Sequence, residues 1–198
     1  GLAGVLGGDE EGESTGALLI DGAPAAAARG RAGLVLQDPD SQVILARVGD
    51  DVAFGCENLN VPREEIWQRV RESLDMVGLG GLELDRSTRH LSGGQRQRVA
   101  LGRALAIERQ ILLLDEPLSN LDARIRLQMR HEIRSIQRQL GVTAILVTHD
   151  REEAMVMADQ VVILDQGKVA QVGTPEQVYQ QPASPYVASF MGAENIVD

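Results

Sequence analysis

Residues 91–122 read LSGGQRQRVALGRALAIERQILLLDEPLSNLD, and they carry the strongest structural pattern of the chain. Its first part, Ser92-Gly93-Gly94-Gln95, predicts the start of a helix that runs to about residue 105. A short apolar strand, Ile111–Leu114, follows and leads directly into two acids, Asp115 and Glu116. A strand that delivers carboxylates at its carboxyl end is typical of open α/β sheets, where ligands bind at that edge.

Downstream of this stretch, strand-like and helix-like segments alternate. Apolar residues recur every three or four positions over 121–140, which predicts an amphipathic helix that Gly141 ends. The further predicted elements are a strand over 143–148, a helix over 151–158, a hairpin over 161–172 and two short helices over 175–181 and 185–191. The alternation indicates an α/β fold with a mostly parallel central sheet.

Upstream, the signals are weaker. Short strands are predicted over 17–20 and 33–37, and residues 23–30 read as a short helix or loop. A helix begins near Pro62 and ends at Gly78, with one apolar stripe formed by Ile66, Val70, Leu74 and Val77. The mostly helical stretch from about 50 to 100 therefore reads as a lobe inserted into the α/β core.

Composition limits the function classes. The net charge of −10 over 198 residues argues against a broad nucleic-acid-binding surface, so no nucleic-acid partner is expected. No apolar run approaches the roughly 18 residues of a membrane span. The single cysteine, Cys56, excludes an internal disulfide, fits a reducing cytosol and reads as a packing residue.

Several polar residues stand where strands end. Asp115 can hold a magnesium ion that bridges phosphates, and Glu116 can polarise an attacking water, although either could be a solvated strand end. Gln37 and His149 each follow a strand-like run and could reach a metal-bound water or a γ-phosphate. A lone histidine or glutamine at such a position is more often structural.

The helix start at Ser92-Gly93-Gly94-Gln95 offers free backbone N–H groups and the positive end of a helix dipole, which together favour an anion. The glycines would let a phosphate approach closely. The alternative is an ordinary N-cap, since serine is a common cap residue.

The order Gln37, Leu91–Gln95, Asp115-Glu116, Ser119–Asp122 and His149 resembles that of the ATP-binding cassette (ABC) ATPases. The resemblance implies an ABC-type P-loop NTPase core with a mostly parallel central sheet, plus an inserted helical lobe that carries the signature motif. It implies one ATPase domain over 1–198, truncated at its N-terminus. Within it, 1–37 and 106–198 would form the catalytic α/β core, and 38–105 the Q-loop and helical lobe.

The resemblance also implies roles for individual residues. Glu116 would be the general base, His149 the switch histidine, and Gln37 the Q-loop glutamine, which shares the magnesium ion with Asp115. The residues expected to bind nucleotide, in a head-to-tail dimer, are Ser92, Gly93, Gly94, Gln95 and Asp122. ATP and Mg²⁺ are the implied cofactors.

An importer ATPase is the implied function, in which ATP-driven dimer closure is coupled to solute transport. Its partners would be transmembrane permease subunits and a second ATPase subunit, identical or different. The implied location is cytoplasmic, peripheral on the inner face of the cell membrane. The short spacing between Gln37 and Leu91 leaves no room for the long coiled coil of the chromosome-maintenance and DNA-repair ABC ATPases.

One motif of the family is missing. No Gly-x4-Gly-Lys-Ser/Thr phosphate loop occurs in the 198 residues, and the family pattern places it just before residue 1. The segment Gly7–Thr15 has the right spacing but puts Glu13 where lysine is needed, and its carboxylate would repel a triphosphate. We therefore expect weak or no ATP hydrolysis by this chain alone. The alternative function is a nucleotide-binding-deficient interaction module.

The subtype signals are mixed. Residues 1 to about 90, including Gln37–Gln42, look like the ATPases of energy-coupling-factor importers. Residues from about 105, including Gly173-Thr174-Pro175, look like polyamine, iron or sugar importer ATPases, which usually continue into a regulatory domain. The transported substrate stays open.

Overall fold

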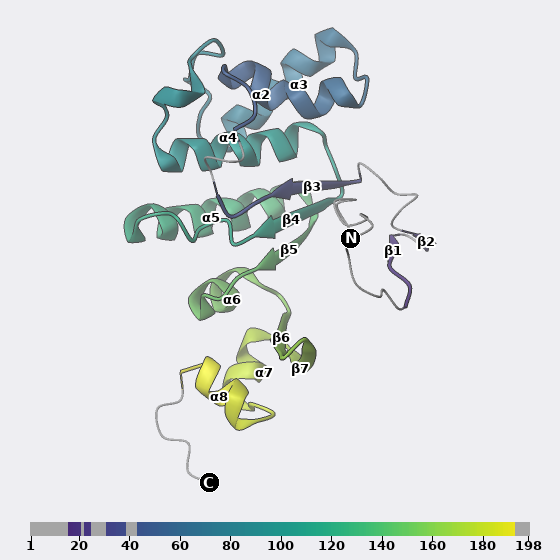
Figure 1. Ribbon diagram of the computed structural model, residues 1–198, viewed down its shortest axis with the longest axis vertical. Coiled ribbons are helices and arrows are strands. Elements are labelled where there is room, and N and C mark those ends of the chain that lie inside the picture. The colour runs from purple at the N-terminus through teal and green to yellow at the C-terminus, as the bar shows by residue number, and fades with distance from the viewer. Residues whose placement is uncertain (1–15, 21, 25–30, 39–42, 193–198) are drawn as a thin grey trace. The chain divides into compact units, whose positions relative to one another are not determined.

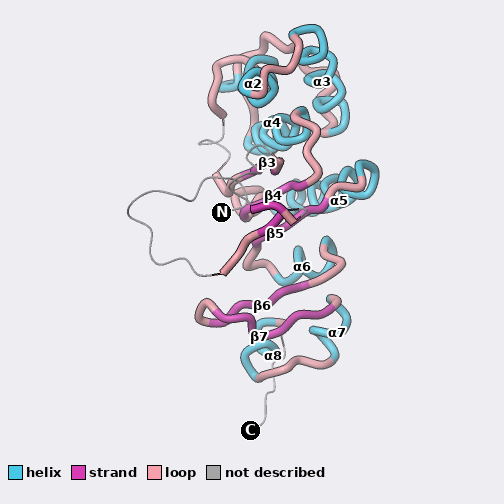
Figure 2. Tube along the Cα trace, turned by 90° about the vertical axis from the view of Figure 1, so that its right-hand side faces the viewer, coloured by secondary structure: helices cyan, strands magenta, loops and turns pink. Residues whose placement is uncertain are grey.

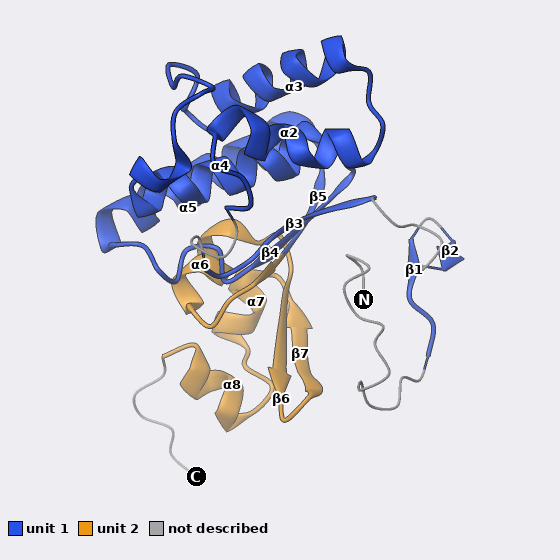
Figure 3. Cartoon of the chain, turned by 45° about the horizontal axis from the view of Figure 1, so that its top comes forward, with its two compact units in different colours: residues 1–145 blue, residues 146–198 orange. Residues whose placement is uncertain are grey.

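The computed structural model describes residues 16–20, 22–24, 31–38 and 43–192. The chain has two compact units, Gly1–Ile145 and Leu146–Asp198, which Figure 3 shows in blue and orange. The division into a core (1–37 and 106–198) and a helical lobe (38–105) stays a prediction.

A three-stranded sheet has the order β3 (Ala32–Val35), β4 (Ile111–Asp115), β5 (Thr143–Val147), and the first unit ends within β5, at Ile145. The strands β3 and β4 pair in parallel, and Val35 lies opposite Leu114 (Figure 1). This pairing confirms the prediction of a parallel arrangement at the centre. It also brings the carboxyl ends of the two strands to one edge, which is the edge that carries the candidate site.

A small antiparallel pair, β1 (Leu19–Ile20) and β2 (Ala23–Pro24), precedes the sheet. The predicted strand over 17–20 is confirmed in its second half. The prediction of a helix or loop beginning at residue 23 is wrong at its start, because Ala23 pairs with Ile20 across the Asp21-Gly22 turn. Residues 25–30 lie outside the described part of the chain.

Three helices of the first unit pack on one another: α2 (Val48–Asn58), α3 (Arg63–Met76) and α4 (Gly93–Ala106). Figure 1 shows them together beside β3, which α4 contacts. A 3₁₀ turn, Thr88–His90, precedes α4. The predicted apolar stripe of α3 is confirmed as the buried face, formed by Ile66, Val70, Leu74 and the following Val77.

The contact between β3 and α4 depends on a glycine. A Cβ atom added at Gly33 would lie 2.8 Å from the Ala104 carbonyl oxygen and 3.2 Å from its Cβ. We expect Gly33→Ala to lower the free energy of unfolding by about 1–3 kcal/mol, because the helix backbone must move away from the strand. Urea denaturation measures this loss. Gly81→Ala is the control, since its Cβ would meet no atom within 4 Å, and an equal loss there would contradict the explanation.

The longest helix is α5 (Ala123–Leu140). It starts two residues later than predicted because Asp122 caps it, and it ends at Gly141, whose φ of 64° is left-handed. Its buried face contains Met129, Ile133 and Ile136. None of the helices in the described ranges has both the length and the apolar character needed to cross a membrane.

The second unit holds α6 (Arg151–Met157), the antiparallel hairpin β6 (Val161–Asp165) and β7 (Lys168–Gly173), α7 (Pro175–Gln180) and α8 (Pro185–Phe190). Figure 2 shows the hairpin in magenta with α7 and α8 beside it. All five predicted elements are confirmed to within about a residue or two at each end. The core of this unit comprises Val161, Ile163, Val178, Val187 and Met191.

Cys56 is fully buried in the first unit, and its thiol donates a hydrogen bond to the Ala106 carbonyl oxygen at 3.2 Å. Burial raises the pKa of the Cys56 thiol. A neutral buried thiol behaves as a small apolar side chain. The prediction that Cys56 is a packing residue is confirmed.

Candidate functional site

Gln37 and Glu116 meet at the carboxyl edge of β3 and β4. The Gln37 side-chain amide donates to the Glu116 carboxylate at 3.0 Å, although 79 positions separate the two residues. Asn120 adds a second link, because its Nδ2 donates to the Gln37 carbonyl oxygen at 3.2 Å. The parallel register of β3 and β4 therefore brings together an amide and a carboxylate that the sequence predicted separately.

The backbone at Glu116 is unusual. Its φ of 45° is left-handed, a region that residues other than glycine rarely adopt, and Pro117 follows it. Ser119 holds the turn, since its backbone N–H and its hydroxyl both donate to the Glu116 carbonyl oxygen, at 3.2 and 3.0 Å. Strained backbone of this kind concentrates at functional sites and persists where surrounding contacts fix it.

Asp115 is the last residue of β4, and its side chain is exposed. Gln37 uses its Nε2 on Glu116, so its amide oxygen is the atom left to serve as a ligand. Magnesium binds one or two protein oxygens and takes its other ligands from phosphate and water. Asp115 and Gln37 fit that requirement. The described residues hold no group of three or more His, Cys, Asp or Glu side chains that could bind a metal.

The start of α4 is a capping box. The Ser92 hydroxyl accepts from the Gln95 N–H at 3.2 Å, and the Gln95 side chain accepts from the Ser92 N–H at 3.0 Å. The first N–H groups of a helix have no acceptor within the helix. The backbone N–H groups of Gly93 and Gly94 therefore point out of the N-terminal end of α4. A Cβ at Gly93 would meet no atom within 4 Å, whereas one at Gly94 would lie 3.1 Å from Ile125.

The sequence left two interpretations of Ser92 open, an ordinary N-cap and part of an anion site. Ser92 is an N-cap, and the helix start that it caps is open beside Gly93. An uncovered helix N-terminus can accept an anion. Binding of a γ-phosphate by Ser92, Gly93, Gly94 and Gln95 stays a prediction.

Asp122 has a structural task. Its carboxylate caps α5 by accepting from the N–H groups of Arg124 at 3.1 Å and Ile125 at 3.0 Å. A capped carboxylate still presents its second oxygen to solvent. The predicted nucleotide-binding role of Asp122 is not excluded by this cap and stays a prediction.

His149 lies two residues after β5, in the second unit, and its side chain is exposed. Its neighbours in the chain form hydrogen bonds. The Asp150 carboxylate caps α6 by accepting from the Glu152 N–H at 2.8 Å, and the Thr148 hydroxyl donates to the Glu153 carboxylate at 2.7 Å. A switch role for His149 stays a prediction.

Sequence reasoning missed Asp51. Its carboxylate is fully buried and accepts from the N–H groups of Ile44 at 2.7 Å and Leu45 at 2.9 Å. Arg103 of α4 donates to its other oxygen at 3.0 Å. The sequence does contain a signal for a buried carboxylate, because Asp51 lies on the same face of α2 as the apolar residues Val48 and Val52.

Thr88 strengthens the same connection. Its hydroxyl donates to the Leu45 carbonyl oxygen at 2.9 Å, and its backbone N–H donates to Ala46 at 3.0 Å. The segment that follows the Gln37 loop is thus bonded to the segment that precedes the helix start at Ser92. No local sequence pattern indicates this contact, which joins residues more than forty positions apart.

The remaining predicted feature, the segment Gly7–Thr15 with Glu13 in place of lysine, lies outside the described residues.

Comparison with known proteins gives a consistent result. A family model described as "ABC transporter" matches residues 2–119. The chain is 54% identical over 146 residues to the trehalose/maltose import ATP-binding protein MalK of Thermococcus litoralis. The aligned residues make up 74% of this chain and 39% of that relative. It is 50% identical over 149 residues to the Fe(3+) ions import ATP-binding protein FbpC of Photorhabdus laumondii, 75% of this chain and 42% of the relative. The aligned region spans about two fifths of these curated relatives.

A solved structure is similar as well. CbiO1 from Clostridium perfringens, described as part of the ABC transporter complex cbiONQ, matches with a TM-score of 0.80 and 33% identity. The match covers 92% of this chain and 73% of that one. Similarity to the CbiO1 structure and to sugar and iron import proteins parallels the mixed subtype signals of the sequence.

Proposed function

The chain belongs to the ABC transporter family, and we propose that it is an ATP-binding and ATP-hydrolysing subunit of a membrane importer. One observation carries the proposal: the hydrogen bond between Gln37 and Glu116 at the edge where parallel strands present ligands. The relatives named as import ATP-binding proteins support the importer class.

The chemistry we propose is in-line attack of water on the γ-phosphate. Glu116 accepts the proton of the attacking water while the new oxygen–phosphorus bond forms and the bond to the β-phosphate oxygen breaks. Gln37 orients the Glu116 carboxylate through its Nε2. His149 would contact the γ-phosphate as the switch histidine, and ATP binding would close the dimer.

Asp115 and the Gln37 amide oxygen would hold Mg²⁺, which neutralises the charge that develops on the phosphates. The helix start at Ser92-Gly93-Gly94-Gln95, together with Asp122, would complete the nucleotide site of a second ATPase subunit in a head-to-tail dimer. The open space beside Gly93 supports this proposal, because a phosphate from another subunit could approach there.

Transmembrane permease subunits are the proposed membrane partners, and the second ATPase subunit is identical or different. We propose a cytoplasmic location at the inner face of the membrane. The CbiO relative, described as part of a cbiONQ complex, supports assembly with other subunits.

We expect the 198-residue chain alone to hydrolyse ATP about 10²–10³-fold more slowly than a chimera that carries a Gly-x4-Gly-Lys-Thr phosphate loop ahead of residue 1. The reason is that the 198 residues contain no Gly-x4-Gly-Lys-Ser/Thr motif to hold the β- and γ-phosphates. Magnesium-dependent phosphate release measures the difference.

Calorimetric titration with ATP distinguishes this proposal from the alternative of an interaction module. Nucleotide binding by the chimera, together with turnover, supports an ATPase subunit. A folded chimera that still binds no ATP would favour the interaction module, and fast turnover by the unmodified chain would contradict the expected role of the phosphate loop.

A further inference from the structure

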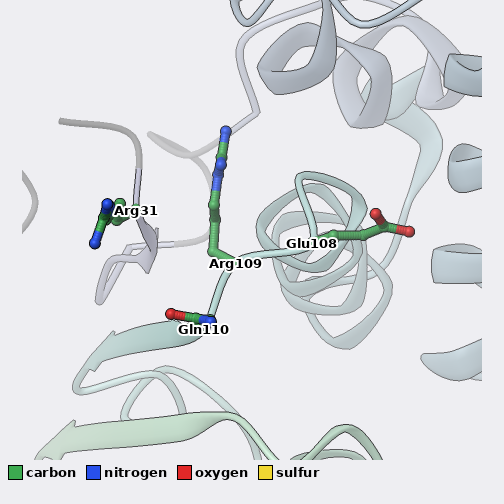
Figure 4. Close-up of a pocket in the computed structure, with 4 residues that line it drawn as sticks. All are labelled: Arg31, Glu108, Arg109 and Gln110. Atoms are coloured by element: carbon green, nitrogen blue, oxygen red, sulfur yellow. The ribbon is translucent and has the colours of Figure 1, made fainter. Parts of the chain in front are cut away.

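A pocket of about 460 Å³ lies at the opposite edge of the sheet from Gln37 and Glu116. Arg31 directly precedes β3, and Gln110 directly precedes β4, so both stand at the amino ends of the parallel strands. Glu108 and Arg109, from the loop between α4 and β4, complete the lining (Figure 4). None of these four residues takes part in the proposed ATPase chemistry.

The described lining of the pocket carries a net positive charge. Arg31 and Arg109 contribute two guanidinium groups, and Gln110 contributes an amide. Glu108 is the one acid in the described lining, and its carboxylate is bound to Arg69 of α3 at 2.9 Å. Figure 4 shows the Glu108 side chain extending away from Arg31 and Gln110. The Glu108 carboxylate is therefore directed toward Arg69, which also binds Glu65.

Arg109 has an unmet hydrogen-bonding requirement. Its Nε is buried, and no acceptor among the described residues reaches it. A buried donor without a partner is energetically unfavourable. Several arginines of the chain have an Nε in this state, but Arg109 is the one that lines the pocket. An oxyanion in the pocket could supply the missing acceptor.

The loop that presents Arg109 is held in a costly conformation. Glu108 has a φ of 49°, a left-handed value that is rare for a residue other than glycine. The Glu108 N–H is fixed to the Leu105 carbonyl oxygen at 2.8 Å, and the Glu108 carboxylate to Arg69. These contacts hold Glu108 turned outward while Arg109 lines the pocket.

We propose that this pocket binds a small phosphate-type oxyanion, either free phosphate or the phosphate group of a small metabolite, through Arg31, Arg109 and Gln110. Planar guanidinium groups bind phosphate oxygens with paired hydrogen bonds, and the amide of Gln110 adds a neutral donor. The volume is within the range of small-molecule sites, so it accommodates more than a bare ion. This site is separate from the proposed nucleotide site and does not depend on it.

The test is calorimetric titration of the 198-residue chain with inorganic phosphate and with glycerol phosphate, at constant ionic strength. We expect Arg109→Gln and Arg31→Gln each to weaken binding by about tenfold or more, because each removes a charge-assisted hydrogen bond. Arg71→Gln, which removes an exposed arginine of α3, is the matched control and should leave binding unchanged.

Tighter binding of glycerol phosphate than of inorganic phosphate would identify a phosphorylated metabolite as the ligand, and the reverse order would identify free phosphate. Circular dichroism establishes that each variant is folded. The proposal is overturned if the folded chain binds neither compound, or if Arg109→Gln and Arg71→Gln change the affinity equally.

Discussion

Replacement of Asp51 by alanine is expected to lower the free energy of unfolding by about 3–5 kcal/mol, the usual cost of removing one partner of a buried ion pair. The Asp51 carboxylate is fully buried, and the Arg103 side chain is 13% exposed. The substitution removes the carboxylate that Arg103 binds at 3.0 Å. It also leaves the N–H groups of Ile44 and Leu45 without the acceptor that holds them.

Urea denaturation followed by circular dichroism measures this loss. Asp50→Ala is the matched control, because Asp50 is the neighbouring acid in the same first turn of α2 but is exposed. Asp50→Ala should lower the free energy of unfolding by less than about 1 kcal/mol, the usual contribution of an exposed charge near a helix dipole. Equal losses for the two variants would show that the Asp51 contacts contribute little.

A double variant separates the charge from the volume. Asp51→Leu combined with Arg103→Met replaces both charges by apolar groups of similar size, which in buried pairs is often neutral or stabilising. We expect it to be more stable than Asp51→Ala. A double variant as unstable as the single one would mean that the hydrogen bonds to Ile44 and Leu45, rather than the ion pair, account for the effect.

Substitution of Glu116 by glutamine is expected to slow ATP hydrolysis by about 10²–10⁴-fold, the usual contribution of a general base. Glutamine keeps the size of the side chain and still offers an oxygen to Gln37, but it cannot accept the proton of the attacking water. The experiment uses the chimera with a phosphate loop, in which turnover is large enough to measure. Steady-state phosphate release gives the rate.

ATP affinity is the second measurement on this variant. We expect calorimetry to give an unchanged affinity for Glu116→Gln, because the carboxylate acts on water rather than on the ground-state nucleotide. Glu64→Gln, an exposed acid in the first turn of α3, should change neither quantity. A rate within twofold of the unsubstituted chimera would remove Glu116 from the role of base.

The elements of the fold were predictable where a strong local pattern marks them. The spacing of apolar residues predicted α3 and α5, and Asp165-Gln166-Gly167 predicted the β6–β7 hairpin. Glycine at position 141 predicted the end of α5, because a left-handed residue is needed there. The short pair β1–β2 was only partly predicted, since two-residue strands have too few positions for a period to appear.

The candidate site was predictable as a set of residues but not as an arrangement. Asp115 and Glu116 could be recognised because they end an apolar strand. Asn120 could not be recognised as a partner of the Gln37 backbone, since nothing in the chain between them marks the contact. The N-cap role of Asp122 in α5 was likewise not predicted, because Asp122 was assigned to a family motif instead.

The order of motifs along the chain, by itself, determined the family, because chemical groups that must handle a triphosphate occur there in one sequence with fixed spacing. The tertiary structure alone decided that Gln37 bonds to Glu116, that Asp51 joins the Gln37 side of the chain to α4, and that Arg31 and Arg109 share a pocket. The physical reason is that these contacts join distant segments. They depend on strand register and helix packing, which no local window of sequence contains.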